Sequence, residues 1–274
     1  MQENSFKFLF LNYWRSLDKK IFFCFLILFF LGLFFSFSST SFLAGERLNK
    51  DYYFFFSKHL VFTFLALIIM VVISIIKTEF LINLVFPLFI ISFCLLAMVP
   101  ITGVEVKGAQ RWIDLYFFRL QPIEILKPFF ILVTVKILTS EKFKNSKLKY
   151  FLSFIILASV IILLIDQPDL GQSLLLIGSW TAVVFISGVS LVMIFIFFSI
   201  FSIFLSSLLY FLPEKFGYII NRLITFFDPS QGDKFQSSSA LEAIKLGGLT
   251  GQGMGEGILK DSVPEAHTDY VIAV

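Results

Sequence analysis

Long apolar runs separated by short polar stretches dominate this chain of 274 residues. About 20 consecutive apolar residues cross the hydrocarbon core of a bilayer as a helix. Backbone polar groups in that core must be bonded within their own segment, so such runs fold as membrane helices. We expect seven of them, at roughly Ile21–Ser39, His59–Ile76, Phe80–Val99, Pro122–Leu138, Tyr150–Ile165, Leu170–Ile186 and Leu191–Leu212. The predicted fold class is an all-α polytopic membrane protein.

Composition excludes several other classes of protein. Hydrophobic residues make up 58% of the chain and charged residues only 15%, against about 25% charged in a typical soluble domain. No soluble segment carries a basic stripe interleaved with aromatic residues, so we do not expect nucleic-acid binding. Two cysteines and two histidines form no cluster with ligand spacing, so we expect no structural metal site.

Lysines in the short loops predict the orientation, because cytoplasmic loops are enriched in positive charge. Residues 1–20 are basic, and the loop between the fourth and fifth runs holds Lys142, Lys144, Lys147 and Lys149. A cytoplasmic N-terminus places both segments inside. The polar stretches 107–121, 166–169 and 213–269 then share the extracytoplasmic face. We expect a cytoplasmic segment 1–20 and a transmembrane domain 21–274, with 213–269 as a large extracytoplasmic loop.

The last residues begin a further apolar run. Residues 270–274 cover only a fraction of a membrane at 1.5 Å rise per residue, so we expect an eighth helix that continues past Val274 and a chain that is a piece of a longer protein. Asp269 stands at the mouth of this helix. A carboxylate there usually has a function, although it could only cap the helix. His267 is expected to be a hydrogen-bonding neighbour of Asp269 and not a metal ligand.

A charged pair opens the fourth run. Glu124 and Lys127 are three residues apart, so they share one helix face. They form either an internal ion pair that fixes helix packing, or a site in which Lys127 binds an anionic head group and Glu124 orients it.

Two further stretches carry polar side chains on the same face. Arg111 and Trp112 are either an ordinary interfacial pair with a snorkelling arginine, or a phosphate-binding arginine beside a platform for a sugar. Asp166 and Asp169 flank a break in the apolar pattern, where either could only cap the sixth helix. The glycine-rich stretch 247–257 lacks the phosphate-loop pattern and is expected to permit tight turns.

Four motifs together resemble the SEDS family (shape, elongation, division and sporulation). They are residues 108–113 (GAQRWI), 121–127 (QPIEILK), 167–171 (QPDLG) and 264–269 (PEAHTD). Their order and spacing agree with the family across nearly the whole chain. Stretches 227–229, 233–236 and 253–257 are more similar to the division branch than to the elongation branch. The resemblance implies about ten membrane helices of about 20 residues in a full-length member.

The resemblance also implies an activity. SEDS proteins are peptidoglycan glycosyltransferases that polymerise lipid II at the outer face of the inner membrane, with a class B penicillin-binding protein. Asp269 is the implied catalytic aspartate. The implied binding residues for undecaprenyl-pyrophosphate-linked donor and lipid II are Arg111, Trp112, Glu124, Lys127 and Asp169. The reaction would invert the donor anomeric carbon, and a divalent cation (Mg or Mn) could share in stabilising the leaving group. Other division proteins and a septal location are also implied.

Two other functions remain open from the residues. A flippase for lipid-linked precursors would use intramembrane charges such as Glu124 and Lys127, and it predicts essential charges along the whole crossing. A division scaffold without catalysis predicts that Asp269→Asn keeps function. The grouping of polar residues on one face favours the enzyme.

Overall fold

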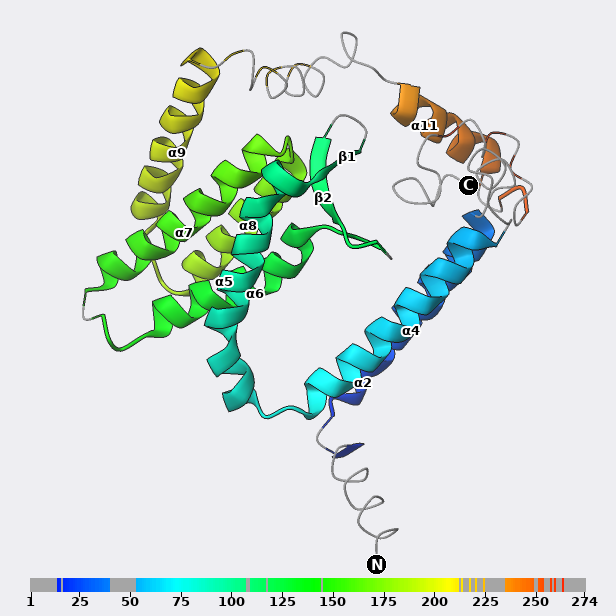
Figure 1. The fold of residues 1–274 in the computed structure, drawn as a ribbon, viewed down its shortest axis with the longest axis horizontal. Helices are drawn as coiled ribbons and strands as arrows, with labels where there is room; N and C mark the ends of the chain where they lie inside the picture. The colour runs from blue at the N-terminus through cyan, green and yellow to red at the C-terminus, as the bar shows by residue number, and fades with distance from the viewer. Residues whose placement is uncertain are drawn as a thin grey trace, which may run out of the picture. The chain divides into compact units, whose positions relative to one another are not determined.

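The computed structural model describes the chain in several ranges (Figure 1). These are residues 14–15, 17–39, 53–106, 109–116, 118–143, 145–211 and 235–248, with isolated positions at 213, 217, 220, 224, 251–253, 257, 259 and 263. Contacts divide the chain into two compact units. One comprises Met1–Lys77 with Pro229–Val274, and the other Thr78–Asp228. Each unit is described by itself.

Each of the seven predicted apolar runs is helical. The helices are α2 (Lys19–Ser39), α4 (Phe54–Ile75), α5 (Thr78–Thr102), α6 (Pro122–Thr139), α7 (Ser146–Asp166), α8 (Leu170–Ile186) and α9 (Leu191–Phe211). By length and composition, α2, α4, α5, α7 and α9 can cross a membrane, and α8 is a shorter apolar helix. The all-α polytopic fold class is confirmed. The predicted eighth run, 270–274, lies outside the described residues.

The first unit pairs α2 with α4. Asp18 begins α2 as a side-chain cap, since its Oδ1 accepts from the backbone N–H groups of Lys20 and Ile21 at 3.0 and 3.2 Å. The Lys19 ammonium lies 5.8 Å from the ring centroid of Trp14. Such a cation over an indole is typical of the interface between lipid and water.

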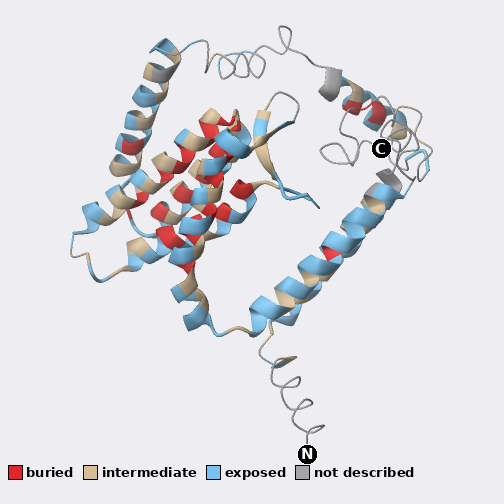
Figure 2. Ribbon diagram, in the orientation of Figure 1, coloured by how far each residue is buried: buried red, intermediate tan, exposed pale blue. Residues whose placement is uncertain are grey.

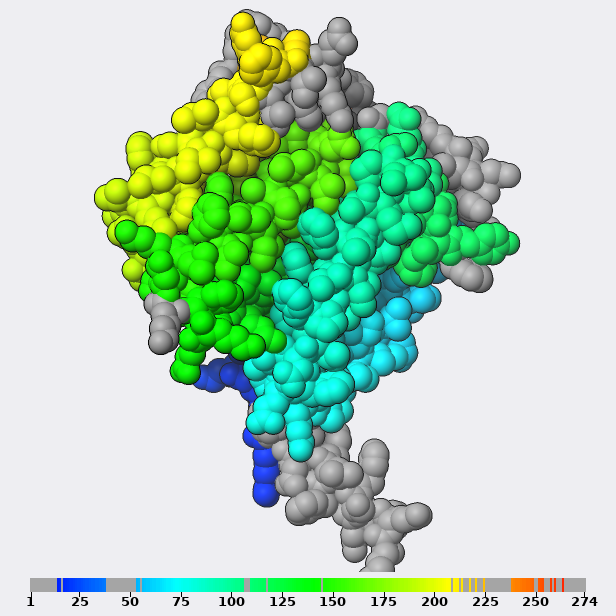
Figure 3. Space-filling model, turned by 60° about the vertical axis from the view of Figure 1, so that its left-hand side comes forward, coloured from blue at the N-terminus to red at the C-terminus, as the bar shows by residue number. Residues whose placement is uncertain are grey.

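The second unit has a packed interior formed by α5, α6, α7 and α8, shown as the red bands in Figure 2. Lipid is as apolar as these side chains, so close packing and interhelical hydrogen bonds hold the helices together. Trp180 of α8 is an example, since its ring packs on Phe154 and Phe197 and its Nε1 donates to Ser153 Oγ at 3.2 Å. Figure 3 shows the side chains of α9 (yellow) against the preceding helices (green).

A small antiparallel sheet joins α5 to α6, and the sequence analysis did not predict it. Its strands β1 (Val104–Val106), β2 (Ala109–Asp114) and β3 (Arg119–Leu120) lie in the order β1-β2-β3. Val104 pairs with Trp112, and Asp114 pairs with Arg119. These strands are too short to show a clear alternation of polar and apolar residues, which explains why the pattern was missed.

Helix α5 also runs further than expected, to Thr102 instead of Val99. Pro100 lies inside it, and a proline within a membrane helix is tolerated where other groups satisfy the freed backbone. The helix closes where the Gly103 N–H donates to the Val99 carbonyl at 2.7 Å. A Cβ at Gly103 would strike that same carbonyl oxygen, so the turn into β1 requires glycine.

The predicted long loop contains a helix, α11 (Phe235–Gly247). Its Ala240 and Ala243 are buried in a small cluster with Val263, which stands six residues before Asp269 in the sequence. Gly248 ends the helix at φ +58°, and its N–H donates to the Ile244 carbonyl at 3.2 Å. A glycine in the left-handed region commonly ends a helix. The sequence analysis had expected only tight turns from this glycine-rich stretch, not a helix end.

Replacing Phe130, which is fully buried on α6, should destabilise the second unit. Phe130→Ala leaves a cavity of roughly 100 Å³, which costs about 2 kcal/mol at about 24 cal/mol per Å³. The thermal unfolding midpoint in detergent micelles measures the loss. Phe151→Ala is the control, because Phe151 is 52% exposed on α7. Equal shifts for the two variants would contradict the burial of Phe130 in the packed interior.

Candidate functional site

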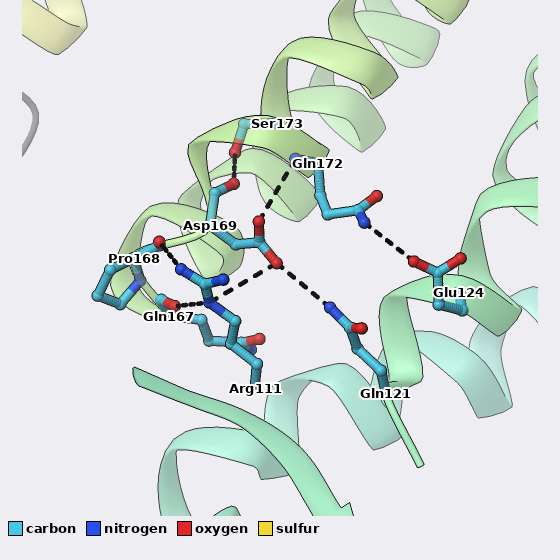
Figure 4. Close-up of polar contacts among 8 residues, drawn as sticks. All are labelled: Arg111, Gln121, Glu124, Gln167, Pro168, Asp169, Gln172 and Ser173. Carbon is cyan, nitrogen blue, oxygen red and sulfur yellow. Dashed lines mark hydrogen bonds and ion pairs between the residues drawn. The ribbon is translucent and has the colours of Figure 1, made fainter. Parts of the chain in front are cut away.

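Polar side chains gather at one end of the second unit, where α5 and α7 end and α6 and α8 begin. The hairpin strand β2 borders the same place (Figure 4). Of the predicted site residues, Arg111, Glu124, Lys127 and Asp169 are brought together here. Trp112 lies next to Arg111 on β2, and successive strand residues point to opposite faces, so it does not share the Arg111 contacts. Asp269 and His267 lie outside the described residues.

The break between α7 and α8 supplies the buried carboxylate of the site. Asp169 is the N-cap of α8, with its Oδ1 accepting from the Gln172 backbone N–H at 3.4 Å. Ser173 Oγ donates to the Asp169 carbonyl at 2.9 Å. The capping role considered from the sequence is therefore confirmed. Asp169 is only 7% exposed, so a cap alone leaves most of its charge to be neutralised by other groups.

Arg111 reaches this break from strand β2. Its Nε donates to the Gln167 carbonyl at 3.2 Å, and its Nη2 donates to the Pro168 carbonyl. The same Nε lies 3.8 Å from Asp169 Oδ2. One guanidinium thus satisfies two carbonyls at the helix break and pairs with the carboxylate that follows them. Its planar arrangement of five donors suits such a task.

Glu124 and Lys127 form the ion pair that their spacing predicted. Lys127 Nζ lies 2.6 Å from Glu124 Oε2, on the first turns of α6. The Lys127 side chain is 20% exposed and the Glu124 side chain 50% exposed. The pair is thus accessible at the end of the bundle, and both readings from the sequence, packing and head-group binding, are compatible with it.

Two glutamines connect the ion pairs, and the sequence analysis missed both. Gln172 donates through Nε2 to Glu124 Oε1 at 2.9 Å, and Gln121 donates through Nε2 to Asp169 Oδ2 at 3.4 Å (Figure 4). The contact with Glu124 fixes the amide orientation of Gln172, because a carboxylate accepts only from the nitrogen. The sequence did contain a signal for them. Gln121 and Gln172 each lie three residues from a charged residue at the start of an apolar run, where an amide can hydrogen-bond to a carboxylate.

Metal binding has little support among the described residues. They contain no group of three or more histidine, cysteine, aspartate or glutamate side chains placed to hold an ion. Asp169 and Glu124 are each already paired with a cation.

The other end of these helices has a different charge. Lys136 lies in the last turn of α6, and Lys142, Lys147 and Lys149 lie in or near the turn into α7. Lys136 Nζ donates to the Ile82 carbonyl of α5 at 2.9 Å. The paired charges and the lysine-rich turn therefore mark opposite ends of the bundle.

A bundle of apolar helices with paired charges at one end defines a multi-pass membrane protein with a polar site at one face. The chain belongs to the FtsW/RodA/SpoVE family: the family model, described as a cell cycle protein, matches residues 18–274. It is thus a multi-pass protein of the inner membrane, as the SEDS resemblance implied.

Individual relatives agree with this assignment. A protein of Wigglesworthia glossinidia brevipalpis, named as a probable peptidoglycan glycosyltransferase FtsW, is 34% identical over 265 residues, covering 94% of this chain and 68% of that protein. The crystal structure of RodA, the rod shape determining protein of Thermus thermophilus, is 26% identical, with a TM-score of 0.56 over 68% of this chain and 60% of that one. A chain of a solved peptidoglycan synthase complex is 20% identical, with a TM-score of 0.66 over 90% of this chain and 70% of that chain, and supports the fold. The chain spans between 58% and 68% of the length of the curated relatives it matches.

Two substitutions of Asp169 should separate its cap from its charge. Asparagine caps helices as well as aspartate does, so Asp169→Asn keeps the cap but removes the charge facing Arg111 and the Oδ2 acceptor of Gln121. We expect a loss of roughly 1–3 kcal/mol, below the about 3–5 kcal/mol of a fully buried pair. Asp169→Ala should lose about 1 kcal/mol more with the cap. Thermal unfolding in detergent measures both.

The control for this pair is Asp114→Asn. Asp114 Oδ2 lies 3.8 Å from Arg119 Nε, but the two side chains are 46% and 54% exposed. Exposed pairs contribute about 0–1 kcal/mol, so this variant should melt almost as the wild type. An Asp169→Asn protein that also melts as the wild type would show that Arg111 does not need the charge.

Proposed function

We propose that this protein is a peptidoglycan glycosyltransferase that polymerises lipid II into glycan strands at the outer face of the membrane during septal wall synthesis. The observation that carries the proposal is the pair of cations, Arg111 and Lys127, held at one end of the bundle by carboxylates and amides. A reaction whose leaving group is a pyrophosphate needs cationic groups at a membrane surface. The names of the curated relatives support this chemistry.

The proposed reaction is a single displacement. The 4-hydroxyl of the acceptor lipid II attacks the anomeric carbon of the donor glycan from the face opposite its undecaprenyl pyrophosphate. The new glycosidic bond forms as the bond to the pyrophosphate breaks, so an α-linked donor gives a β-linked product. Asp269 takes the hydroxyl proton as general base, a contribution of about 10²–10⁴-fold in rate. The pyrophosphate leaves with the bonding electrons.

Arg111 and Lys127 stabilise the charge that develops on the leaving pyrophosphate. Both are held in advance, Arg111 by the carbonyls at the helix break and Lys127 by Glu124, so little reorganisation is needed when the charge appears. Their side chains are 26% and 20% exposed, which leaves donors accessible to a ligand. Trp112, on the opposite face of β2, is the proposed aromatic platform for a sugar.

The orientation follows from charge. The lysine-rich turn before α7 faces the cytoplasm under the positive-inside rule, which puts the paired charges and the loop 213–269 outside. Residues 1–20 are then a cytoplasmic segment, and 21–274 form the transmembrane domain. Val263, next in sequence to the motif 264–269, is buried against α11.

A flippase fits the described residues less well. The charged side chain that is buried among them is Asp169, at the end of the bundle, whereas the other buried polar groups are hydroxyls and one amide. A pathway for a pyrophosphate head group would need charged or hydrated groups along the crossing. This pattern favours chemistry at one face. A non-catalytic division scaffold makes no use of the paired cations.

We propose a class B penicillin-binding protein, a transpeptidase, as partner, together with other division proteins. The support is the fold likeness to a chain of a peptidoglycan synthase complex, whose description joins polymerization with crosslinking. A polymerase and a crosslinking enzyme acting on one strand benefit from being held together, because the second step becomes effectively intramolecular.

The test is polymerisation of lipid II by the full-length protein, purified with its class B partner and reconstituted in liposomes. Wild type should form glycan strands, and Asp269→Asn should form them at least about 100-fold more slowly, as expected for loss of a general base. Asp261→Asn is a matched control from the same loop and should keep activity.

Equal product from wild type and Asp269→Asn would remove Asp269 from the chemistry. If wild type forms no product but moves lipid II across the liposome bilayer, the flippase replaces the enzyme. If neither polymerisation nor lipid transport appears while the partner still binds, the non-catalytic scaffold is the better account of the function.

A further inference from the structure

Pro100 interrupts the hydrogen bonding of α5 inside the packed unit. In an α-helix each backbone N–H bonds to the carbonyl four residues earlier, and proline has no N–H. The carbonyl that lacks its usual donor belongs to Leu96, which is fully buried. A backbone carbonyl left unpaired in a membrane interior is costly, so another donor is required.

Gln167 supplies that donor from a distant part of the chain. Its Nε2 donates to the Leu96 carbonyl at 3.1 Å, and the residue is only 3% exposed. The amide thus replaces the missing N–H of Pro100. Because amide nitrogen is the only donor that this side chain has, the contact also fixes which way the amide points.

The backbone of Gln167 belongs to the site. Its N–H donates to the carbonyls of Leu163 and Leu164, both at 3.2 Å, at the end of α7. Its own carbonyl accepts from Arg111 Nε at 3.2 Å, and the next carbonyl, of Pro168, also accepts from Arg111. The side-chain contact with α5 therefore holds in place the two carbonyls that orient the guanidinium.

We propose that Gln167 is a positioning residue for Arg111, because it bonds the carbonyl that Pro100 leaves free and so fixes the helix break that holds the guanidinium. The inference rests on the proposed function for its catalytic consequence, whereas its structural part stands without it. Pro100 and Gln167 then act together: the proline leaves a buried carbonyl without its helical donor, and the glutamine bonds that carbonyl and so joins α5 to the break between α7 and α8.

This coupling of Pro100 and Gln167 predicts a specific rescue. Gln167→Met keeps the size of the side chain but removes the donor, so the Leu96 carbonyl loses its partner. We expect a thermal midpoint several degrees lower and polymerisation about five- to a hundred-fold slower, as for an unpaired buried polar group. Adding Pro100→Ala returns an N–H four residues after Leu96, so the double variant should recover most of the thermal midpoint. Polymerisation should stay slow, because the side chain at position 167 still makes no bond to α5.

The matched control is Pro87→Ala on the same helix. Pro87 frees the carbonyl of residue 83, which Gln167 does not contact. This change should therefore rescue nothing in the Gln167→Met background. A role in positioning Arg111 further predicts that Gln167→Met changes the same kinetic parameter, kcat or KM, as Arg111→Lys. A purely structural role would instead lower the amount of folded enzyme and leave KM unchanged.

Full chain and partner are used throughout, with thermal midpoints and initial rates measured on each variant. If Gln167→Met lowers the thermal midpoint as much in the Pro100→Ala background as in the wild type, the inference is wrong. If Pro87→Ala rescues equally, the gain is general helix stabilisation and the inference is also wrong. If wild type forms no glycan, the proposed function fails, and the thermal midpoints alone still decide whether Gln167 and Pro100 are coupled.

Discussion

Arg111 holds the polar end of the bundle together. It comes from a short strand, yet its donors reach two carbonyls and a carboxylate at the break between α7 and α8. In an apolar surrounding those acceptors could find few other donors, and each would be costly if left unpaired. The Arg111 side chain thereby ties the hairpin to the break between α7 and α8, so the positions of the two depend on each other.

The carboxylates at this end also have structural duties. Asp169 begins α8 and pairs with Arg111, and Glu124 joins Lys127 to Gln172. A substitution at either position changes helix geometry as well as charge. Activity lost in such a variant is therefore evidence for catalysis only when the folded state is shown to survive.

Much of the helix layout could be predicted from the sequence, because a run of apolar residues has few alternatives in a bilayer. The pair Glu124 and Lys127 was predictable for a similar reason, since helical spacing alone places the two side chains on one face. The hairpin from 104 to 120 was not, because its strands contain two to six residues and carry no usable pattern. The extension of α5 past Pro100 was also missed, since it depends on Gln167, far away in the sequence. Local patterns predict what a segment does alone, whereas amide contacts between segments require the tertiary arrangement.

The two ion pairs of the site sum to zero, since Arg111 balances Asp169 and Lys127 balances Glu124. A neutral tetrad produces little field beyond the Debye length, which is about 8 Å at physiological ionic strength. These two pairs therefore do little to steer an approaching anion from a distance. Recruitment would depend on diffusion in the plane of the membrane, and the site would discriminate at contact, by how well an arriving group competes with the resident carboxylates for the same donors.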